Sequence, residues 1–309
     1  MIAAYTHDAY LSNVLPSRTT QVVRSALEEV SRSQQRHGLH FPDADSFQTI
    51  AELRNSLLGT SVRSYFLVSI STRFRIVDNC LEYLFQNGWS QAPESEAAEF
   101  FVQTNPALCE ADRASRPRGE YWYAMICGHF PQALVDSLRK HRRSFQAVKV
   151  GSSRPIPLGD VRYDSLWRWC RDEDIPVLLH CSGENESDFT DGLEICRNYP
   201  SLSITLSHLG GMRQSGDDCG VHNKRTLLDR AQILQRNGLP PNLTLNNAVY
   251  DIELTDYLLD AAPELESRIL NALDLPFFGT IEESMNRLAR CRAASKIIDN
   301  TIRYFSKYS

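Results

Sequence analysis

Short apolar runs alternate with amphipathic segments through the second half of the chain. The first clear run covers residues 145–150, with the sequence FQAVKV, and the next covers residues 175–180, with the sequence IPVLLH. A short run that is apolar at nearly every position is typical of a strand buried on both faces of a parallel sheet. Between these runs, apolar residues recur at helical spacing over residues 161–174. This half of the chain is therefore predicted to build a parallel sheet from successive β/α units.

The same alternation continues to residue 290 and gives five β/α units. Strands are predicted at residues 145–150, 175–180, 202–208, 243–246 and 268–273, and helices at residues 161–174, 187–198, 227–237, 254–262 and 281–290. The helix that ends at Asn237 is followed by Gly238 and two prolines, which are strong stop signals.

The first half of the chain has a looser pattern. Strands are predicted at residues 2–5, 65–70 and 121–126, and helices at residues 20–35, 46–58, 74–86, 95–102 and 132–142. Eight parallel strands with intervening helices make an α/β fold of the (β/α)8 TIM barrel type the most economical solution. The surplus helices would be insertions in the N-terminal third. No repeat, low-complexity tract or linker indicates a second domain, so residues 1–309 are predicted to form one barrel domain.

Composition narrows the class of protein. The 309 residues carry 33 Lys and Arg against 38 Asp and Glu, for a net charge of -5, which argues against charge-driven binding to nucleic acid or to a membrane surface. No apolar window is long enough to span a membrane, and the first residues lack a cationic, apolar leader, so a cytoplasmic location is expected. The eight cysteines form no Cys-x-x-Cys pair, and reduced thiols are expected.

Candidate chemistry gathers at the predicted strand ends, where barrel enzymes carry their active sites. His7, His180, His208 and Asp274 each follow a predicted strand, and Lys149 lies near the end of another. One histidine of the eight in the chain would ordinarily be a surface or core residue. Three histidines and a carboxylate that converge on one barrel mouth instead match the nitrogen and oxygen donors of a borderline divalent metal such as zinc.

Two segments resemble a known family. Residues 175–183, IPVLLHCSG, and residues 199–211, YPSLSITLSHLGG, are similar to motifs of the amidohydrolase superfamily, in the amidohydrolase-related branch that contains aminocarboxymuconate-semialdehyde decarboxylase-like enzymes. Residues 145–150 resemble the strand-four element of that branch, and residues 273–276, LDLP, resemble its strand-eight element. The likeness covers roughly residues 121–288.

The resemblance implies a function and a site. By position it makes His7, His180 and Asp274 the metal ligands, with zinc as the expected ion and manganese as the second candidate. His208 would orient the substrate or shuttle a proton, and Asp274 is alternatively the general base. The implied activity is that of a metal-dependent hydrolase or non-oxidative decarboxylase that acts on a small, carboxylated molecule.

Strand one departs from the family pattern, which begins Asp-x-His-x-His. In the matching positions this chain has Ala3, Tyr5 and His7, so Tyr5 stands where the first histidine ligand would be. A tyrosine with an ordinary pKa near 10 is a poor substitute for imidazole at neutral pH. The alternative is therefore a degenerate barrel without catalysis or bound metal, which would serve as a binding or interaction protein.

Other residues bear on the expected partner, which is a small molecule and neither nucleic acid nor membrane. Lys149 and Arg154 would hold an anionic substrate at the mouth, although Lys149 is equally compatible with an ion pair in the barrel interior. Gly210 and Gly211 permit either the close approach of a ligand or a simple turn. Cys181 is expected to point away from His180 if the strand continues. A homo-oligomer is left open.

Overall fold

The computed structural model describes most of the chain from residue 116 onward and parts of the chain before it. Described are residues 11–14, 25, 28, 32, 49–58, 65–69, 74–77, 80–85, 88–90, 114, 116–126, 131–151, 157–181, 188–211, 219–249, 251–273 and 280–307.

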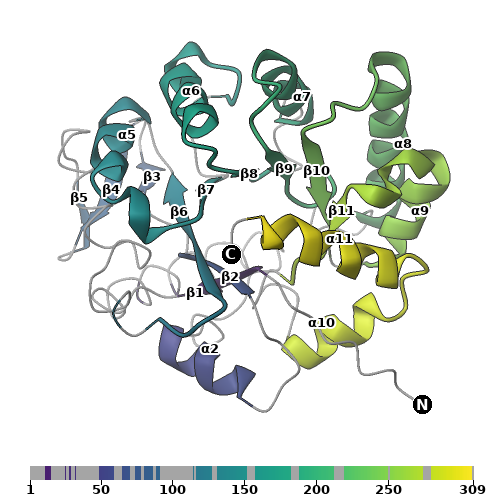
Figure 1. The fold of residues 1–309 in the computed structure, drawn as a ribbon, viewed down its shortest axis with the longest axis horizontal. Helices are drawn as coiled ribbons and strands as arrows, with labels where there is room; N and C mark the ends of the chain where they lie inside the picture. Colours follow the sequence, from purple (N-terminus) through teal and green to yellow (C-terminus); the bar gives the residue numbers. More distant parts are fainter. Residues whose placement is uncertain are drawn as a thin grey trace.

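One curled parallel sheet forms the centre of the molecule (Figure 1). Its eight strands are β1 (Leu11–Val14), β2 (Tyr65–Ser69), β6 (Glu120–Ile126), β7 (Ala147–Val150), β8 (Val177–Leu179), β9 (Ile204–Leu206), β10 (Leu243–Asn246) and β11 (Ile269–Leu270), in that spatial order. Every neighbouring pair is parallel. Backbone pairing is recorded from β1 through to β11, and among the described residues none joins β11 back to β1.

Helices surround the sheet, and most of them connect successive strands (Figure 1). They are α2 (Ile50–Leu57), α5 (Pro131–Arg139), α6 (Asp164–Asp172), α7 (Asp188–Asn198), α8 (Cys219–Asn237), α9 (Glu253–Ala261), α10 (Ile281–Leu288) and α11 (Ala294–Ser306), with short 3-10 turns at Arg142–Ser144, Val161–Tyr163 and Pro263–Ser267. The five predicted β/α units after residue 145 are confirmed. None of the described helices is both long and apolar enough to cross a bilayer.

The predicted helix at residues 74–86 is wrong. The segment instead forms β3 (Phe74–Val77) and β4 (Cys80–Phe85), which join β5 (Gly88–Ser90) in an antiparallel sheet of three strands. The pairs Val77 with Cys80 and Phe85 with Gly88 leave connections of two residues each. Asp, Asn and Gly at such connections favour tight hairpin turns, and this turn chemistry outweighs the helical spacing of the apolar residues.

The strand that pairs with β2 lies further along the chain than the predicted strand one. The strand that pairs with β2 is β1, with Leu11 opposite Phe66 and Val14 opposite Ser69. The predicted strand at residues 2–5 lies outside the described residues. The sequence of β1, LSNV, has two polar residues in its centre, which hid it from a search for apolar runs. Among the described strands β1 is the first along the chain, and His7 precedes it in sequence.

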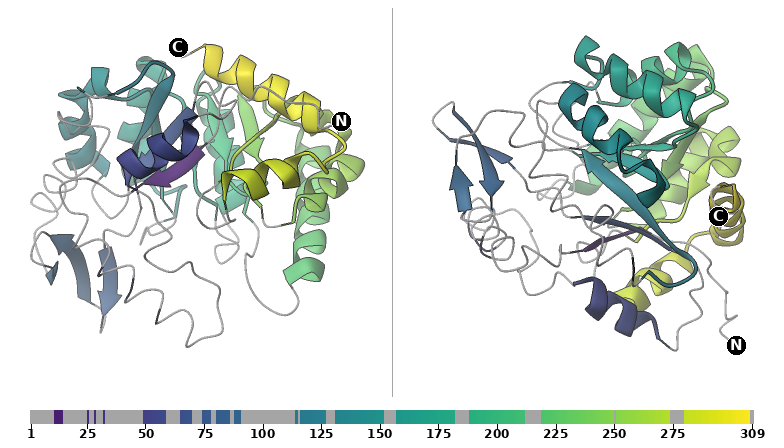
Figure 2. Two further views of the ribbon diagram at one scale, coloured as in Figure 1. Left: turned by 90° about the horizontal axis from the view of Figure 1, so that it is seen from below. Right: turned by 60° about the vertical axis from the view of Figure 1, so that its left-hand side comes forward.

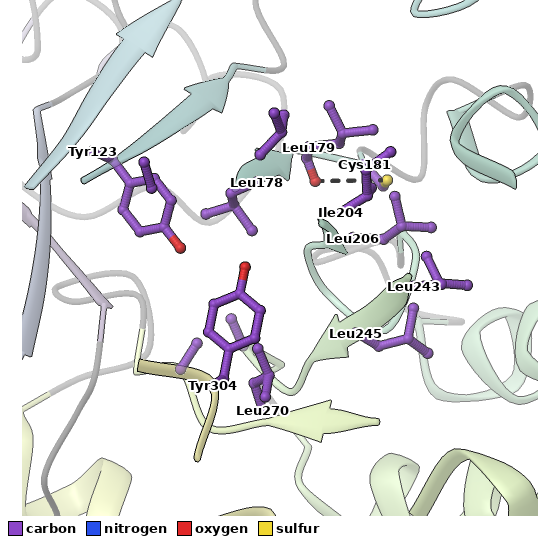
Figure 3. Packing of buried hydrophobic residues seen from close by; sticks show 14 of the residues in the cluster. Tyr123, Leu178, Leu179, Cys181, Ile204, Leu206, Leu243, Leu245, Leu270 and Tyr304 are labelled. Atoms are coloured by element: carbon purple, nitrogen blue, oxygen red, sulfur yellow. Dashed lines mark hydrogen bonds between the residues drawn. The ribbon is translucent and has the colours of Figure 1, made fainter. Parts of the chain in front are cut away.

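The interior face of the sheet is partly polar. Lys149, Leu178, Thr205 and Thr244 occupy one register level of β7 to β10, so their side chains share a face. Figure 3 shows Leu178 on the interior side, facing Tyr304 of α11. Thr205 Oγ1 lies 2.7 Å from Thr244 Oγ1 and 3.3 Å from the Tyr304 hydroxyl. The C-terminal helix, which the sequence did not predict, thus contributes to the interior.

A buried carboxylate joins the beginnings of β2 and β6. Glu120 accepts hydrogen bonds from Arg54 Nε at 2.8 Å, Arg54 Nη2 at 2.7 Å, the Tyr65 hydroxyl at 2.9 Å and Trp122 Nε1 at 2.9 Å. Burial and the Glu120 charge raise the pKa of Tyr65 well above its ordinary value, which keeps this hydroxyl a donor. These contacts tie α2 to the sheet at the amino-terminal ends of its strands.

Candidate functional site

His180 and His208 meet at the carboxyl-terminal ends of two neighbouring strands. His180 directly follows β8, and His208 lies two residues after β9. Their ring centroids are 4.7 Å apart with the rings inclined at 71°, and His208 Nε2 lies 3.4 Å from His180 Nδ1. His208 is only 2% exposed, whereas His180 is partly exposed. The structure thus brings together two of the residues that the sequence predicted for the site.

The hydrogen bonds of His208 select its tautomer. His208 Nδ1 lies 2.5 Å from the carbonyl oxygen of Ala248, which can only accept a hydrogen bond. The proton is therefore assigned to Nδ1, and in the neutral ring Nε2 carries the lone pair. His180 Nδ1 then donates to His208 Nε2, which leaves the lone pair of His180 on its Nε2. That atom is the one with which His180 can bind a metal ion.

Asn246, the last residue of β10, holds the backbone around His208. Its Oδ1 accepts hydrogen bonds from the amides of His208 at 3.0 Å and Ala248 at 3.3 Å. Its carbonyl oxygen accepts a hydrogen bond from the amide of Leu209 at 2.8 Å. One side chain therefore holds both the residue that carries the imidazole and the residue that accepts the imidazole proton.

The backbone after β9 is strained. His208 and Leu209 have φ angles of 55° and 51°, in the left-handed region, and Gly210 and Gly211 follow at 86° and 93°. A left-handed conformation costs a residue with a Cβ about 1–2 kcal/mol. Strain of this kind persists only where the surroundings impose it, and it concentrates at functional sites.

The two glycines are required by protein contacts. A Cβ on Gly210 would lie 2.6 Å from Cδ2 of Phe189, and a Cβ on Gly211 would lie 2.9 Å from Cβ of Cys181. The turn therefore packs directly against the residue that follows His180 and against the first turn of α7. Cys181 itself is buried, and its thiol lies 3.8 Å from the carbonyl oxygen of Leu179, as Figure 3 shows.

Asn247 holds the backbone at the end of β11 by hydrogen bonds, as Asn246 does for the backbone around His208. Its Oδ1 accepts a hydrogen bond from the amide of Ala272 at 3.0 Å, and its own amide donates to the carbonyl oxygen of Leu270 at 3.0 Å. Its Nδ2 is buried and has no hydrogen-bond partner in the described part of the chain. Neither asparagine was among the predicted site residues, although an Asn-Asn pair at the end of an apolar strand is a usable signal.

The remaining predicted site residues have different outcomes. Lys149 is buried and, by register, lies on the interior face one level below His180, which follows Leu178 by two positions. His7, Arg154 and Asp274 lie outside the described residues, so their roles stay predictions. Within the described residues no three His, Cys, Asp or Glu side chains are grouped so as to hold a metal ion.

The fold and the histidine pair together define a class. No protein-family model matches the chain, and no curated protein matches its sequence. Solved structures match along nearly the whole chain, and they include amidohydrolases and decarboxylases. The chain therefore has the α/β fold of these enzymes, and the predicted resemblance to the amidohydrolase superfamily is confirmed at the level of the fold.

Three of these structures indicate which particular proteins the chain is similar to. A 2,6-dihydroxybenzoate decarboxylase in complex with 2,6-dihydroxybenzoate has a TM-score of 0.64 at 14% identity, over 97% of this chain and 99% of that one. The 5-carboxyvanillate decarboxylase of Novosphingobium aromaticivorans, with bound manganese, has a TM-score of 0.62 at 14% identity, over 98% of both chains. An amidohydrolase from Burkholderia multivorans, with bound zinc, has a TM-score of 0.58 at 10% identity, over 98% of this chain and all (100%) of that one.

Proposed function

We propose that the protein is a metal-dependent enzyme, a non-oxidative decarboxylase or a hydrolase, that acts on a small carboxylated molecule. The contact between His180 and His208 at the ends of β8 and β9 carries the proposal. It joins an imidazole whose tautomer leaves Nε2 available for a metal ion to an imidazole that is held in place by Asn246 and Ala248. The similar structures that contain manganese, zinc or an aromatic carboxylate support the same reaction class.

A divalent ion, zinc or manganese, would be held by His180 Nε2 together with Asp274, and His7 is the third candidate ligand. When bound, such an ion supplies a Lewis acid that polarises a substrate oxygen. Because β1 begins at Leu11, the position of His7 along strand one no longer supports its assignment, and His7 needs its own test. Asp274 as the general base remains the alternative to Asp274 as a ligand.

His208 is the group assigned to move a proton. Its Nδ1 is committed to the carbonyl of Ala248, so only Nε2 can exchange a proton with the reacting molecule. In a hydrolysis, Nε2 would exchange its hydrogen bond from His180 Nδ1 for the attacking water and accept the proton of that water. In a decarboxylation, the electron pair of the broken C–C bond stays on the substrate carbon, and protonated Nε2 would deliver the proton to it. Lys149 and Arg154 are the groups assigned to the substrate carboxylate.

The enzyme is favoured over a barrel without catalysis. The case for a degenerate barrel depended on Tyr5 in the place of a ligand on strand one. The described strand that pairs with β2 is formed by residues 11–14, which do not include Tyr5. A barrel without a catalytic site does not require the left-handed backbone at His208 and Leu209, which costs stability. Both observations point to a site that is organised around His208.

Replacing the two histidines separately tests the proposal. In His180→Ala we expect the affinity for manganese or zinc to fall by about 10- to 100-fold or more, as measured by titration and by elemental analysis of the purified protein. In His208→Gln metal content should be retained, while release of CO2 from 2,6-dihydroxybenzoate or a related hydroxybenzoate should fall by about 100- to 10,000-fold.

His141→Gln is the matched control, because His141 lies before β7, at the opposite end of the sheet from the histidine pair. It should change neither metal binding nor turnover. His7→Ala and Asp274→Asn extend the test to the two ligands outside the described residues. Equal metal binding by the unmodified protein and His180→Ala would refute the assignment of the ligand.

A further inference from the structure

Arg230, in the second half of α8, is a buried cation outside the histidine pair. Its side chain is only 9% exposed, and Nη1 is buried with no hydrogen-bond partner. Across the described residues no hydrogen bond or ion pair of Arg230 is recorded. The guanidinium carbon instead lies 5.4 Å from the centre of the Phe189 ring. A guanidinium has five N–H donors, so this arrangement leaves strong donors unused in a buried place.

The electrostatic environment keeps Arg230 charged at neutral pH but does not provide a bonded partner. Burial lowers the pKa of Arg230 to about 10, although Cys181, Asp188 and Asp229 act through space in the opposite direction. A buried charge without hydrogen bonds is strongly destabilising unless another group completes it. The planar fork of a guanidinium is suited to two parallel hydrogen bonds to a carboxylate or a phosphate.

The surroundings of Arg230 come from three elements of the candidate site. Phe189 lies in the first turn of α7, a helix of 11 residues whose first turn also contains the carboxylates of Asp188 and Asp191. Gly210, whose added Cβ would lie 3.6 Å from Arg230 Cδ, belongs to the turn that carries His208. Cys181 follows His180 directly. Arg230 therefore lies close to α7, to the turn after β9 and to the residue after His180.

We propose that Arg230 is an oxyanion-binding site, which takes a carboxylate or phosphate group at Nη1 over the ring of Phe189. Gly210 lies directly against Phe189, where an added Cβ would come within 2.6 Å of the ring, and among the described residues no carboxylate is hydrogen-bonded to Nη1, which leaves this donor for a ligand. An anion bound there would stabilise the strained turn that carries His208. The site requires neither a bound metal nor turnover, so it stands apart from the proposed reaction.

Binding of two simple oxyanions to the full-length protein tests this proposal. Inorganic phosphate and benzoate are titrated at constant ionic strength, and binding is followed by calorimetry and by the shift in Tm. We expect at least one of them to bind and to raise Tm. Arg230→Gln should weaken that binding by about tenfold or more, because it removes charge-assisted hydrogen bonds. Binding of phosphate alone would identify a phosphate-type ligand, and binding of benzoate alone would identify a carboxylate.

Arg236→Gln is the matched control, since Arg236 lies on the same helix and is exposed. It should leave binding unchanged. His208→Gln should also keep anion binding while it loses turnover, which separates failure of this proposal from failure of the proposed reaction. The proposal is overturned if neither anion binds, or if both bind Arg230→Gln as tightly as the unmodified protein.

Stability without added anion gives a second measurement that does not depend on binding. If Arg230 has no partner inside the protein, Arg230→Leu keeps the contact with Phe189, removes a buried charge, and should unfold at the same or a higher urea concentration. A lower urea midpoint would show that the guanidinium is already satisfied within the protein, and would overturn the proposal.

Discussion

The two ends of the parallel sheet use polar groups in opposite ways. At the amino-terminal ends of β2 and β6, the Glu120 carboxylate is fully buried and accepts four hydrogen bonds. At the carboxyl-terminal ends of β8 to β10, the chain instead contains left-handed residues at His208 and Leu209 and, on Asn247, an Nδ2 without a hydrogen-bond partner among the described residues. In parallel α/β barrels the carboxyl-terminal end carries function and the opposite end carries stability. The contrast therefore separates polar groups that the fold satisfies from a region in which strain and an unsatisfied polar atom remain.

Figure 2 shows the same polarity in the arrangement of the elements. In its left view α11 lies along one side of the molecule, and the small sheet of β3, β4 and β5 lies at the opposite side. That small sheet follows β2 along the chain, and therefore leaves the main sheet at the carboxyl-terminal end of β2. Helix α11 and the small sheet thus lie at opposite ends of the main sheet.

The largest expected effect is at the stable end. Glu120→Ala leaves the Arg54 guanidinium, the Tyr65 hydroxyl and the Trp122 indole without their shared acceptor. Breaking a buried ion pair by removal of one partner typically costs about 3–5 kcal/mol of unfolding free energy, which urea denaturation would measure. Turnover per folded molecule should be unchanged.

The exposed pair of Arg139 and Asp136 is the control for Glu120. Its side chains are 52% and 56% exposed, and it joins atoms 3.4 Å apart. Asp136→Asn should change stability by about 1 kcal/mol or less. Similar costs for Glu120→Ala and Asp136→Asn would mean that the four-donor site does not secure the base of the sheet.

An intermediate effect is expected in the strained turn. Gly211→Ala combines a left-handed φ of 93° with a Cβ only 2.9 Å from Cβ of Cys181 and 3.2 Å from its backbone. Overpacking of this kind typically costs roughly 1–3 kcal/mol. Because the turn carries His208, activity per folded molecule should fall as well, and steady-state kinetics on the folded fraction would measure that fall.

Gly238→Ala separates the cost of the left-handed φ from the cost of the steric clash. Gly238 also has a positive φ, 75°, but a Cβ there would have no neighbouring atom within 4 Å. It should lose only the conformational preference of glycine, about 1 kcal/mol, and keep full activity. An activity loss in Gly238→Ala equal to that in Gly211→Ala would remove the link between the turn and the site.

A smaller effect is expected from Asn247→Ala. The change removes the acceptor of the Ala272 amide, so this buried donor loses its partner at a cost of about 1–3 kcal/mol, and it also removes the unpartnered Nδ2, which offsets part of that cost. Urea denaturation would give the net value. A net loss larger than that of Gly211→Ala would contradict the view that Nδ2 is held ready for a ligand.

The smallest effect concerns a partly exposed carboxylate, Asp160. Hydrogen bonds from Arg162 lower the pKa of Asp160 to about 2. A carboxyl group whose pKa is lowered on folding adds stability above its unfolded pKa, and loses that contribution as the pH falls toward the folded value. We therefore expect no effect of Asp160→Asn on the pH dependence of stability between pH 5 and pH 7, and a slight flattening below pH 4. An effect of Asp160→Asn near neutral pH would contradict the lowered pKa of Asp160.

Sequence patterns predicted the part of the fold in which each strand and helix is amphipathic or apolar over several residues. They failed where the deciding factor was turn chemistry, as at residues 74–90, or where a strand had polar residues in its centre, as in β1. They also placed His180 and His208 at adjacent strand ends. The contact between those rings follows from the parallel order of β8 and β9, which local periodicity implies.

The sequence by itself determined the β/α alternation after residue 120 and the residue types available at the strand ends, because burial imposes a pattern that can be recognised over a few residues. Only the tertiary structure decided which polar groups are satisfied. The acceptors of the His208 proton and amide lie about 40 residues away, on and after β10. Whether a charge such as Glu120 or Arg230 has a partner likewise depends on residues brought together by packing, and spacing along the chain carries no record of that.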